Sequence, residues 1–98
     1  MKYHYPPVVY YNWDGIPIPF EEWAALWQGN RTVARDVKGE TVVVTSFLGI
    51  DGMIFETLVR IGDKEVEMVR TRNEHDAMRI HMAMKKKWMG EDGDEDED

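Results

Sequence analysis

The side chains that could do chemistry in this chain are three histidines, one serine and many carboxylates, and their spacing matches no catalytic motif. His75 and His81 are six residues apart, so on a helix they point in different directions and could not share a metal ion. Ser46 lies in a strand-like run outside any Gly-x-Ser-x-Gly turn, and no phosphate-cradling glycine loop is present. We therefore expect a protein that is not an enzyme and binds neither metal nor cofactor.

The acidic residues of the chain are concentrated at its end. The sequence has 12 Lys and Arg against 19 Asp and Glu, and residues 1–90 carry no net charge, so the net charge of −7 lies in residues 91–98. A run of like charges repels itself and buries nothing. We expect a single globular domain at residues 1–90 and a disordered acidic tail at residues 91–98. The acidic residues of the tail are Glu91, Asp92, Asp94, Glu95, Asp96, Glu97 and Asp98.

The composition also limits the partners and the compartment. The chain is 43% hydrophobic and 32% charged and has no cysteine, which is typical of a globular domain without disulfides. A pI near 4.9 argues against direct nucleic-acid binding, because binding to phosphates requires a basic surface. The first residues lack the apolar segment of a signal peptide, and no apolar run is long enough to span a bilayer. We expect a soluble intracellular protein that does not bind membranes.

Two helices are predicted from capping residues and apolar spacing. Pro19 suits the first turn of a short helix, in which Phe20, Trp23 and Trp27 recur at helical intervals until Gly29. A longer helix is predicted to follow a capping box at residues 71–74 and to end near Met89. Its apolar stripe contains Ala77, Met78, His81, Met84 and Trp88. Because His81 lies in that stripe, we expect it to be hydrogen-bonded and partly buried.

Between the helices the apolar residues recur with the period of two that strands require. Strands are predicted at residues 31–37, 41–48, 53–61 and 65–70, and the short turns between them make neighbouring strands antiparallel. Val42, Val43 and Val44 are apolar on both faces, which is typical of a central strand. With a short run at residues 8–11, the prediction is an α+β fold. It has a four- to five-stranded antiparallel meander, a short N-terminal helix and a longer C-terminal helix packed on the sheet.

One face of the third predicted strand could bind a partner. Ile54, Glu56, Leu58 and Arg60 share this face, and two charges between two large aliphatic residues are unusual on a fully solvated surface. Either the face is an amphipathic outer surface with a same-side ion pair, or it binds another protein or a second copy. In the second case the apolar area would supply affinity and the charges would set the register.

Aromatic residues near the N-terminus have two interpretations as well. They could form a contact platform, because Tyr and Trp are frequent in interface hot spots, or they could close the core of a small domain. Trp13 from this group and Asp51 complete the candidate partner-binding residues. The aromatic group consists of Tyr3, Tyr5, Tyr10, Tyr11 and Trp13.

Three blocks of the sequence resemble a family of small uncharacterised proteins from tailed phages of actinobacteria. The blocks lie at residues 12–35, with Asn-Trp-Asp-Gly and Glu-Glu-Trp, at residues 45–59, with Thr-Ser-Phe-Leu-Gly-Ile-Asp and Ile-Phe-Glu-Thr-Leu-Val, and at residues 71–81. Two features depart from the family. The loop between the two central motifs is reduced to residues 51–53, and the acidic tail lies outside the shared region. The resemblance implies a phage accessory protein that acts in the cytoplasm of an infected bacterium, and it implies no particular activity.

These observations favour a non-catalytic viral protein that binds and modulates or inhibits a host protein, with a defence component as one target. The acidic tail could imitate the charge of a nucleic acid. An alternative is an oligomeric protein that binds a nucleotide signal, with aromatic rings stacking on the base and arginines holding phosphate. A second alternative is a minor virion or assembly protein. The arginines considered for phosphate are Arg31, Arg35, Arg60 and Arg70.

Overall fold

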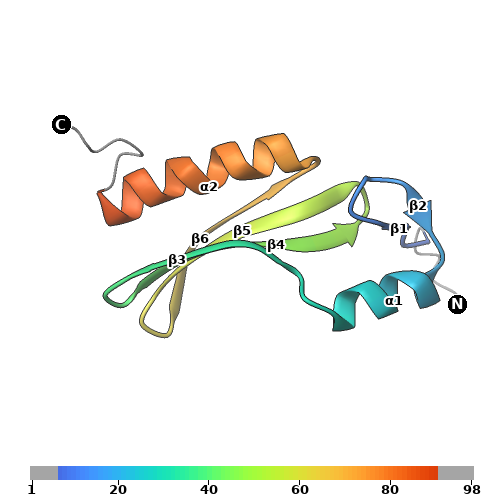
Figure 1. The fold of residues 1–98 in the computed structure, drawn as a ribbon, viewed down its shortest axis with the longest axis horizontal. Helices are drawn as coiled ribbons and strands as arrows, with labels where there is room; N and C mark the ends of the chain where they lie inside the picture. The colour runs from blue at the N-terminus through green and yellow to red at the C-terminus, as the bar shows by residue number, and fades with distance from the viewer. Residues whose placement is uncertain (1–6, 91–98) are drawn as a thin grey trace, which may run out of the picture.

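A computed structural model describes residues 7–90 as a twisted antiparallel sheet with a long helix across one face and a short helix beyond one end of the strands (Figure 1). The α+β architecture predicted from the sequence is confirmed. The acidic tail expected at residues 91–98, and the N-terminal Tyr3 and Tyr5, lie outside the described residues.

Four long strands form the predicted meander, and two short ones extend it. The long strands are β3 (Thr32–Lys38), β4 (Thr41–Ile50), β5 (Met53–Ile61) and β6 (Lys64–Thr71). The short strands are β1 (Tyr10–Tyr11) and β2 (Pro17–Ile18), which pair with each other. β4 is the central strand, as its run of valines predicts, because it pairs with β5 on one side and with β3 and β1 on the other.

The turn between β4 and β5 is shorter than the four residues predicted. β4 continues through Ile50, and the chain reverses at Asp51 and Gly52, which have φ angles of 51° and 85°. Two successive positive φ angles are those of the type I′ turn, whose twist matches that of the strands it joins. Asp51 also holds the segment that precedes β1. The Val9 N–H donates to Asp51 Oδ1 at 3.1 Å, and the Asp51 N–H donates to the Val9 carbonyl at 2.8 Å.

The long helix α2 (Glu74–Met89) ends where the sequence predicts but begins with a different cap. The predicted capping box at residues 71–74 is wrong, because Thr71 still pairs with Phe55 in the sheet. Asn73 is the N-cap instead, and its side chain accepts a 2.8 Å hydrogen bond from the Asp76 N–H. At the other end Gly90 adopts the left-handed conformation of a C-cap.

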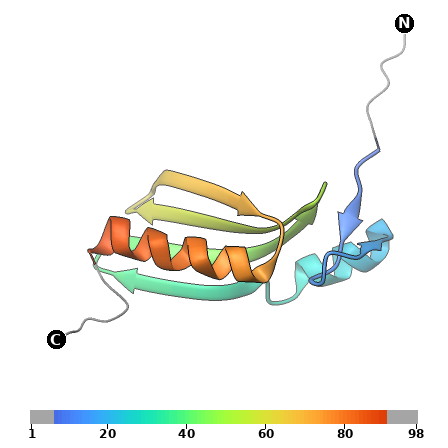
Figure 2. The same ribbon diagram turned by 90° about the horizontal axis from the view of Figure 1, so that it is seen from above.

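The core has two clusters, and each contains residues of the sheet and of α2. The cluster beneath the second half of α2 contains Val43, Val59, Met84 and Met89. The other contains Phe47, Ile54, Phe55 and Ala77, with aromatic and aliphatic residues of the N-terminal segment packed against it. Seen from above, α2 lies over the middle of the sheet and runs along the direction of the four long strands, and the α1, β1 and β2 unit lies beyond one end of them (Figure 2). Neither helix within residues 7–90 is long and apolar enough to cross a membrane.

The short helix α1 (Phe20–Gln28) is held to the sheet by aromatic stacking and has no fully buried residue. The Trp23 indole N–H donates to the Leu48 carbonyl at 3.0 Å. Its ring stacks on Trp27 at a centroid distance of 4.9 Å, and the Arg31 guanidinium covers the Trp27 ring at 3.6 Å. This continuous stack fixes α1 at the end of the strands on the side away from α2 (Figure 1).

Gly49 provides a test of the contact between β4 and the N-terminal segment. Its φ is +69°, and an added Cβ would lie 2.6 Å from the Tyr11 carbonyl oxygen and 2.5 Å from Phe47 Cζ. We expect Gly49→Ala to destabilise the fold by about 2–4 kcal/mol, because positive-φ strain and steric overlap both contribute. The matched control is Gly39→Ala, which has a similar φ of +61° and nothing within 4 Å, and should lose only the strain of about 1–2 kcal/mol. Equal losses in denaturant unfolding would contradict the close packing at Gly49.

Candidate functional site

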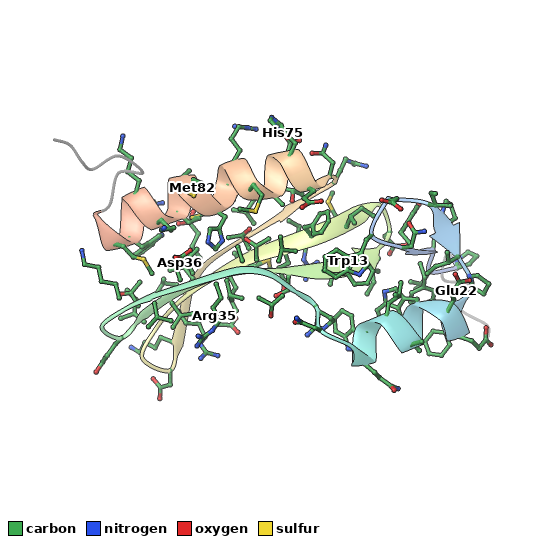
Figure 3. The ribbon with its side chains drawn as sticks, in the orientation of Figure 1. Trp13, Glu22, Arg35, Asp36, His75 and Met82 are labelled. Atoms are coloured by element: carbon green, nitrogen blue, oxygen red, sulfur yellow. The ribbon has the colours of Figure 1, made fainter. Side chains whose placement is uncertain are left out.

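A hydrogen-bonded chain of four side chains runs from the edge of the sheet into the core beneath α2. Asp36 Oδ2 lies 2.8 Å from His81 Nε2, and His81 Nδ1 lies 2.9 Å from Thr45 Oγ1. Thr45 Oγ1 in turn lies 2.6 Å from Thr57 Oγ1. Figure 3 shows Asp36 between the sheet and α2. His81, Thr45 and Thr57 are all at most 1% exposed, so the chain is sealed except at the carboxylate.

The carboxylate orders the hydrogen bonds along this chain. An ionised Asp36 can only accept, so His81 Nε2–H donates to it. In the imidazole tautomer that carries its proton at Nε2, the Nδ1 atom accepts the Thr45 hydroxyl proton. The Thr57 hydroxyl donates to Thr45, which leaves every member of the chain with a partner. The hydrogen bond from His81 lowers the pKa of Asp36, although partial burial opposes the shift, and Lys85 at 3.4 Å adds a further lowering.

The order of carboxylate, imidazole and hydroxyl is that of a nucleophilic triad, but the geometry gives it a structural role. A catalytic hydroxyl must touch its substrate, whereas the Thr45 side chain has no exposed surface. The chain instead joins α2, β3, β4 and β5 through buried polar groups, which are stabilising only when every partner is present. It therefore determines which face of the sheet α2 covers.

Within residues 7–90, the opposite face of the four long strands carries no helix over most of its length, and we call it the open face. Strand register places its side chains in three rows across the sheet, and Figure 3 shows Arg35 on the side away from α2. The first row is next to the β3–β4 and β5–β6 turns and has Val37, Val42, Arg60 and Glu65. The central row has Arg35, Val44, Leu58 and Met68. The third row has Thr32, Ser46, Glu56 and Arg70.

Aliphatic side chains form a diagonal band across the open face. Val37 is 53% exposed and Met68 is 46% exposed, while Val42, Val44 and Leu58 between them are partly exposed. Isolated exposed aliphatic residues are ordinary on a protein surface, whereas a large contiguous apolar patch is unusual on one. Within residues 7–90, neither helix covers this band.

Charged residues flank the band in a defined arrangement. Glu56 pairs across the strands with Arg70 at 3.2 Å, so the same-strand ion pair with Arg60 considered from the sequence does not form. Arg60 instead lies opposite Glu65 in the register, and Arg35 stands at the β3 edge. Among residues 7–90, no ion pair is recorded for Arg35 or Arg60, so their charges are available to another molecule.

The structure brings together only half of the residues predicted to bind a partner. Glu56, Leu58 and Arg60 lie together on the open face. Ile54 is 2% exposed, because it lies in the core cluster against which α1 packs. Trp13 stacks on Phe47 at 5.0 Å, which favours the core interpretation of the N-terminal aromatic residues. Asp51 is exposed but holds the segment before β1.

The free edges of the sheet are less suitable for association than its open face. β6 has one extra residue between Glu65 and Glu67, which pair with the consecutive residues Arg60 and Val59 of β5. β3 has a similar irregularity between Thr32 and Ala34. Bulges and charged residues at sheet edges hinder the addition of further strands. Charged side chains are frequent on both edge strands, at Arg35, Asp36, Lys38, Lys64, Glu65, Glu67 and Arg70.

His81 is hydrogen-bonded, as predicted, and is buried more completely than expected. The sequence also contained a signal for its partners, which was missed. Asp36 has the same strand parity as the core-facing Ala34, and Thr45 lies between Val43 and Phe47 on the core face of β4. A polar residue at a core-facing position needs a buried partner, and His81 in an apolar helix stripe is a matching candidate. Thr71 differs from Thr45, because its hydroxyl is buried and has no hydrogen-bond partner among the described residues.

No protein-family profile matches this chain, and no curated protein or solved structure matches it either. Within the described residues 7–90, no three His, Asp or Glu side chains are grouped so that they could hold a metal ion.

The threonine pair tests whether the buried chain positions α2. Thr45→Val leaves both His81 Nδ1 and the Thr57 hydroxyl without a partner and should destabilise the fold by about 2–3 kcal/mol. Thr57→Val leaves the Thr45–His81 bond intact and should lose only about 1 kcal/mol. The double variant should be close to Thr45→Val alone in denaturant unfolding, because the two hydroxyls act as a unit.

Thr32→Val on the exposed β3 position is the control and should leave the free energy of unfolding nearly unchanged. Strictly additive losses for the two buried threonines, or a larger loss for Thr57→Val than for Thr45→Val, would contradict the hydrogen-bonded order.

Proposed function

We propose that this chain is a non-catalytic phage accessory protein that binds a host protein and modulates or inhibits it. The observation that supports the proposal is the open face, where an aliphatic band is flanked by arginines that have no ion-pair partner among residues 7–90. A surface of this kind gains stability when another protein covers it, because apolar area leaves water and the free charges find partners.

The alternative of a nucleotide-binding protein has less support from the geometry. Base stacking needs an exposed aromatic ring face. The Trp27 ring has Trp23 on one side and the Arg31 guanidinium over it, and Trp23 is also in contact with Tyr10 at 4.7 Å. These ring faces are already used to hold α1, so a base would have to displace contacts that maintain the fold.

Two methionines of nearly equal exposure allow a matched test of the open face. Met68 lies in the centre row of the open face and is 46% exposed, whereas Met82 lies on the outer side of α2 and is 43% exposed (Figure 3). Full-length protein carrying Met68→Lys should capture at least about tenfold less of the host protein from a bacterial lysate, because a lysine charge loses hydration in an apolar contact. Met82→Lys should capture as much as the wild type.

Quantitative mass spectrometry of the captured proteins is the readout, with thermal unfolding to verify that both variants fold. Equal loss of a specific protein with both variants would place the binding surface elsewhere. Capture of no specific protein by the wild type would refute the proposed function.

A further inference from the structure

We propose that a second copy of this chain covers the open face and forms a symmetric dimer with four layers in the order helix, sheet, sheet, helix. The inference rests on the proposed function in that it takes the open face as a protein-binding surface, and it names one occupant. It depends on an arrangement of charges that is complementary to itself.

The centre of that arrangement is Leu58. Consider a two-fold axis that lies between two facing sheets, perpendicular to the strands, and passes between Leu58 and its copy. This axis places each strand over its own copy in the reversed direction, so the first row of one protomer faces the third row of the other. The central rows then meet each other, and their side chains include Val44, Leu58 and Met68. Facing sheets pack about 10 Å apart, a gap that side chains from both sides fill.

The charges on β5 and β6 match under this operation. Arg60 of the first row meets Glu56 of the copy, and Glu65 of the first row meets Arg70 of the copy. Each interprotomer pair occurs twice, so the dimer has four pairs of opposite charge around an aliphatic centre. Such a pattern is what a two-fold interface requires, since the same surface must serve as both partners.

The ion pairs inside each protomer are compatible with the dimer. Glu56 already contacts Arg70 of its own chain at 3.2 Å. Addition of Arg60 from the copy beside Glu56 and of Glu65 from the copy beside Arg70 therefore extends an existing pair into a network of alternating charge. Arg35 is unfavourable because it faces its own copy across the β3 edge, where exposure to solvent screens the repulsion.

The size of the surface indicates a weak dimer. Four strands spaced about 4.8 Å apart, and three rows about 6.6 Å apart along the strands, give roughly 400 Å² per protomer once side-chain width is included. A total of about 800 Å² is below the roughly 1,000 Å² expected of a stable specific interface, so association should be weak and depend on concentration. A host protein that binds the same face would compete with the second copy.

Pairwise charge exchange tests the geometry without a change of composition. The variant E56R/R70E keeps an ion pair within each protomer but places like charges opposite positions 60 and 65 of the copy. The variant R60E/E65R likewise places like charges opposite positions 56 and 70 of the copy. By sedimentation velocity at about 10–500 µM, a range suited to interfaces of this size, the wild type should dimerise and each variant should weaken dimerisation at least tenfold.

A mixture of the two variants provides the decisive control. In the heterodimer every interprotomer pair is again opposite in charge, so equimolar E56R/R70E and R60E/E65R should associate about as strongly as the wild type. The quadruple variant should also dimerise, because all pairs are reversed together.

Three results would overturn the inference: a wild type that stays monomeric throughout the range, variants that dimerise as the wild type does, or a mixture that fails to associate. A monomeric wild type that still captures a host protein through Met68 would leave the proposed function intact. A dimer with the predicted charge dependence that captures no host protein would refute the proposed function alone.

Discussion

The hydrogen-bonded chain from Asp36 through His81 to Thr45 and Thr57 is the constraint on which the rest of the structure depends. It ties α2 to β3, β4 and β5 through groups that cannot be left unpaired in the core. Apolar contacts alone would allow α2 to shift along the sheet, because they are not directional. The polar chain fixes the position of α2 on one face of the sheet.

The open face follows from the small size of the domain. One long helix can cover one face of a four-stranded sheet, and a two-layer domain buries its core between those layers. The other short helix, α1, is fixed beyond the strand ends by its aromatic stack, with Trp23 hydrogen-bonded to Leu48. The strands beneath α2 therefore keep aliphatic side chains of the open face in contact with water among residues 7–90.

Periodicity predicted the fold and half of the candidate site. Strand parity placed Glu56, Leu58 and Arg60 on one face, and the valine run identified β4 as the central strand. The remainder depended on contacts between distant segments. Parity could not show that α1 would pack against the cluster around Ile54, or that Arg70 of the next strand would take Glu56 as its partner. The N-cap was missed because sheet pairing extends to Thr71, and tertiary pairing takes precedence over a local capping pattern.

The central claim is that the open face is covered by a second copy in reversed register, and intermolecular methyl contacts measure this most directly. An isotope-filtered NMR experiment on an equal mixture of labelled and unlabelled full-length protein detects only contacts between protomers. The account predicts contacts from the Leu58 methyl groups to Leu58 and Val44 of the other copy, since these residues occupy the central row. Intermolecular contacts confined to α2 or to the β6 edge, with none from Leu58, would contradict it.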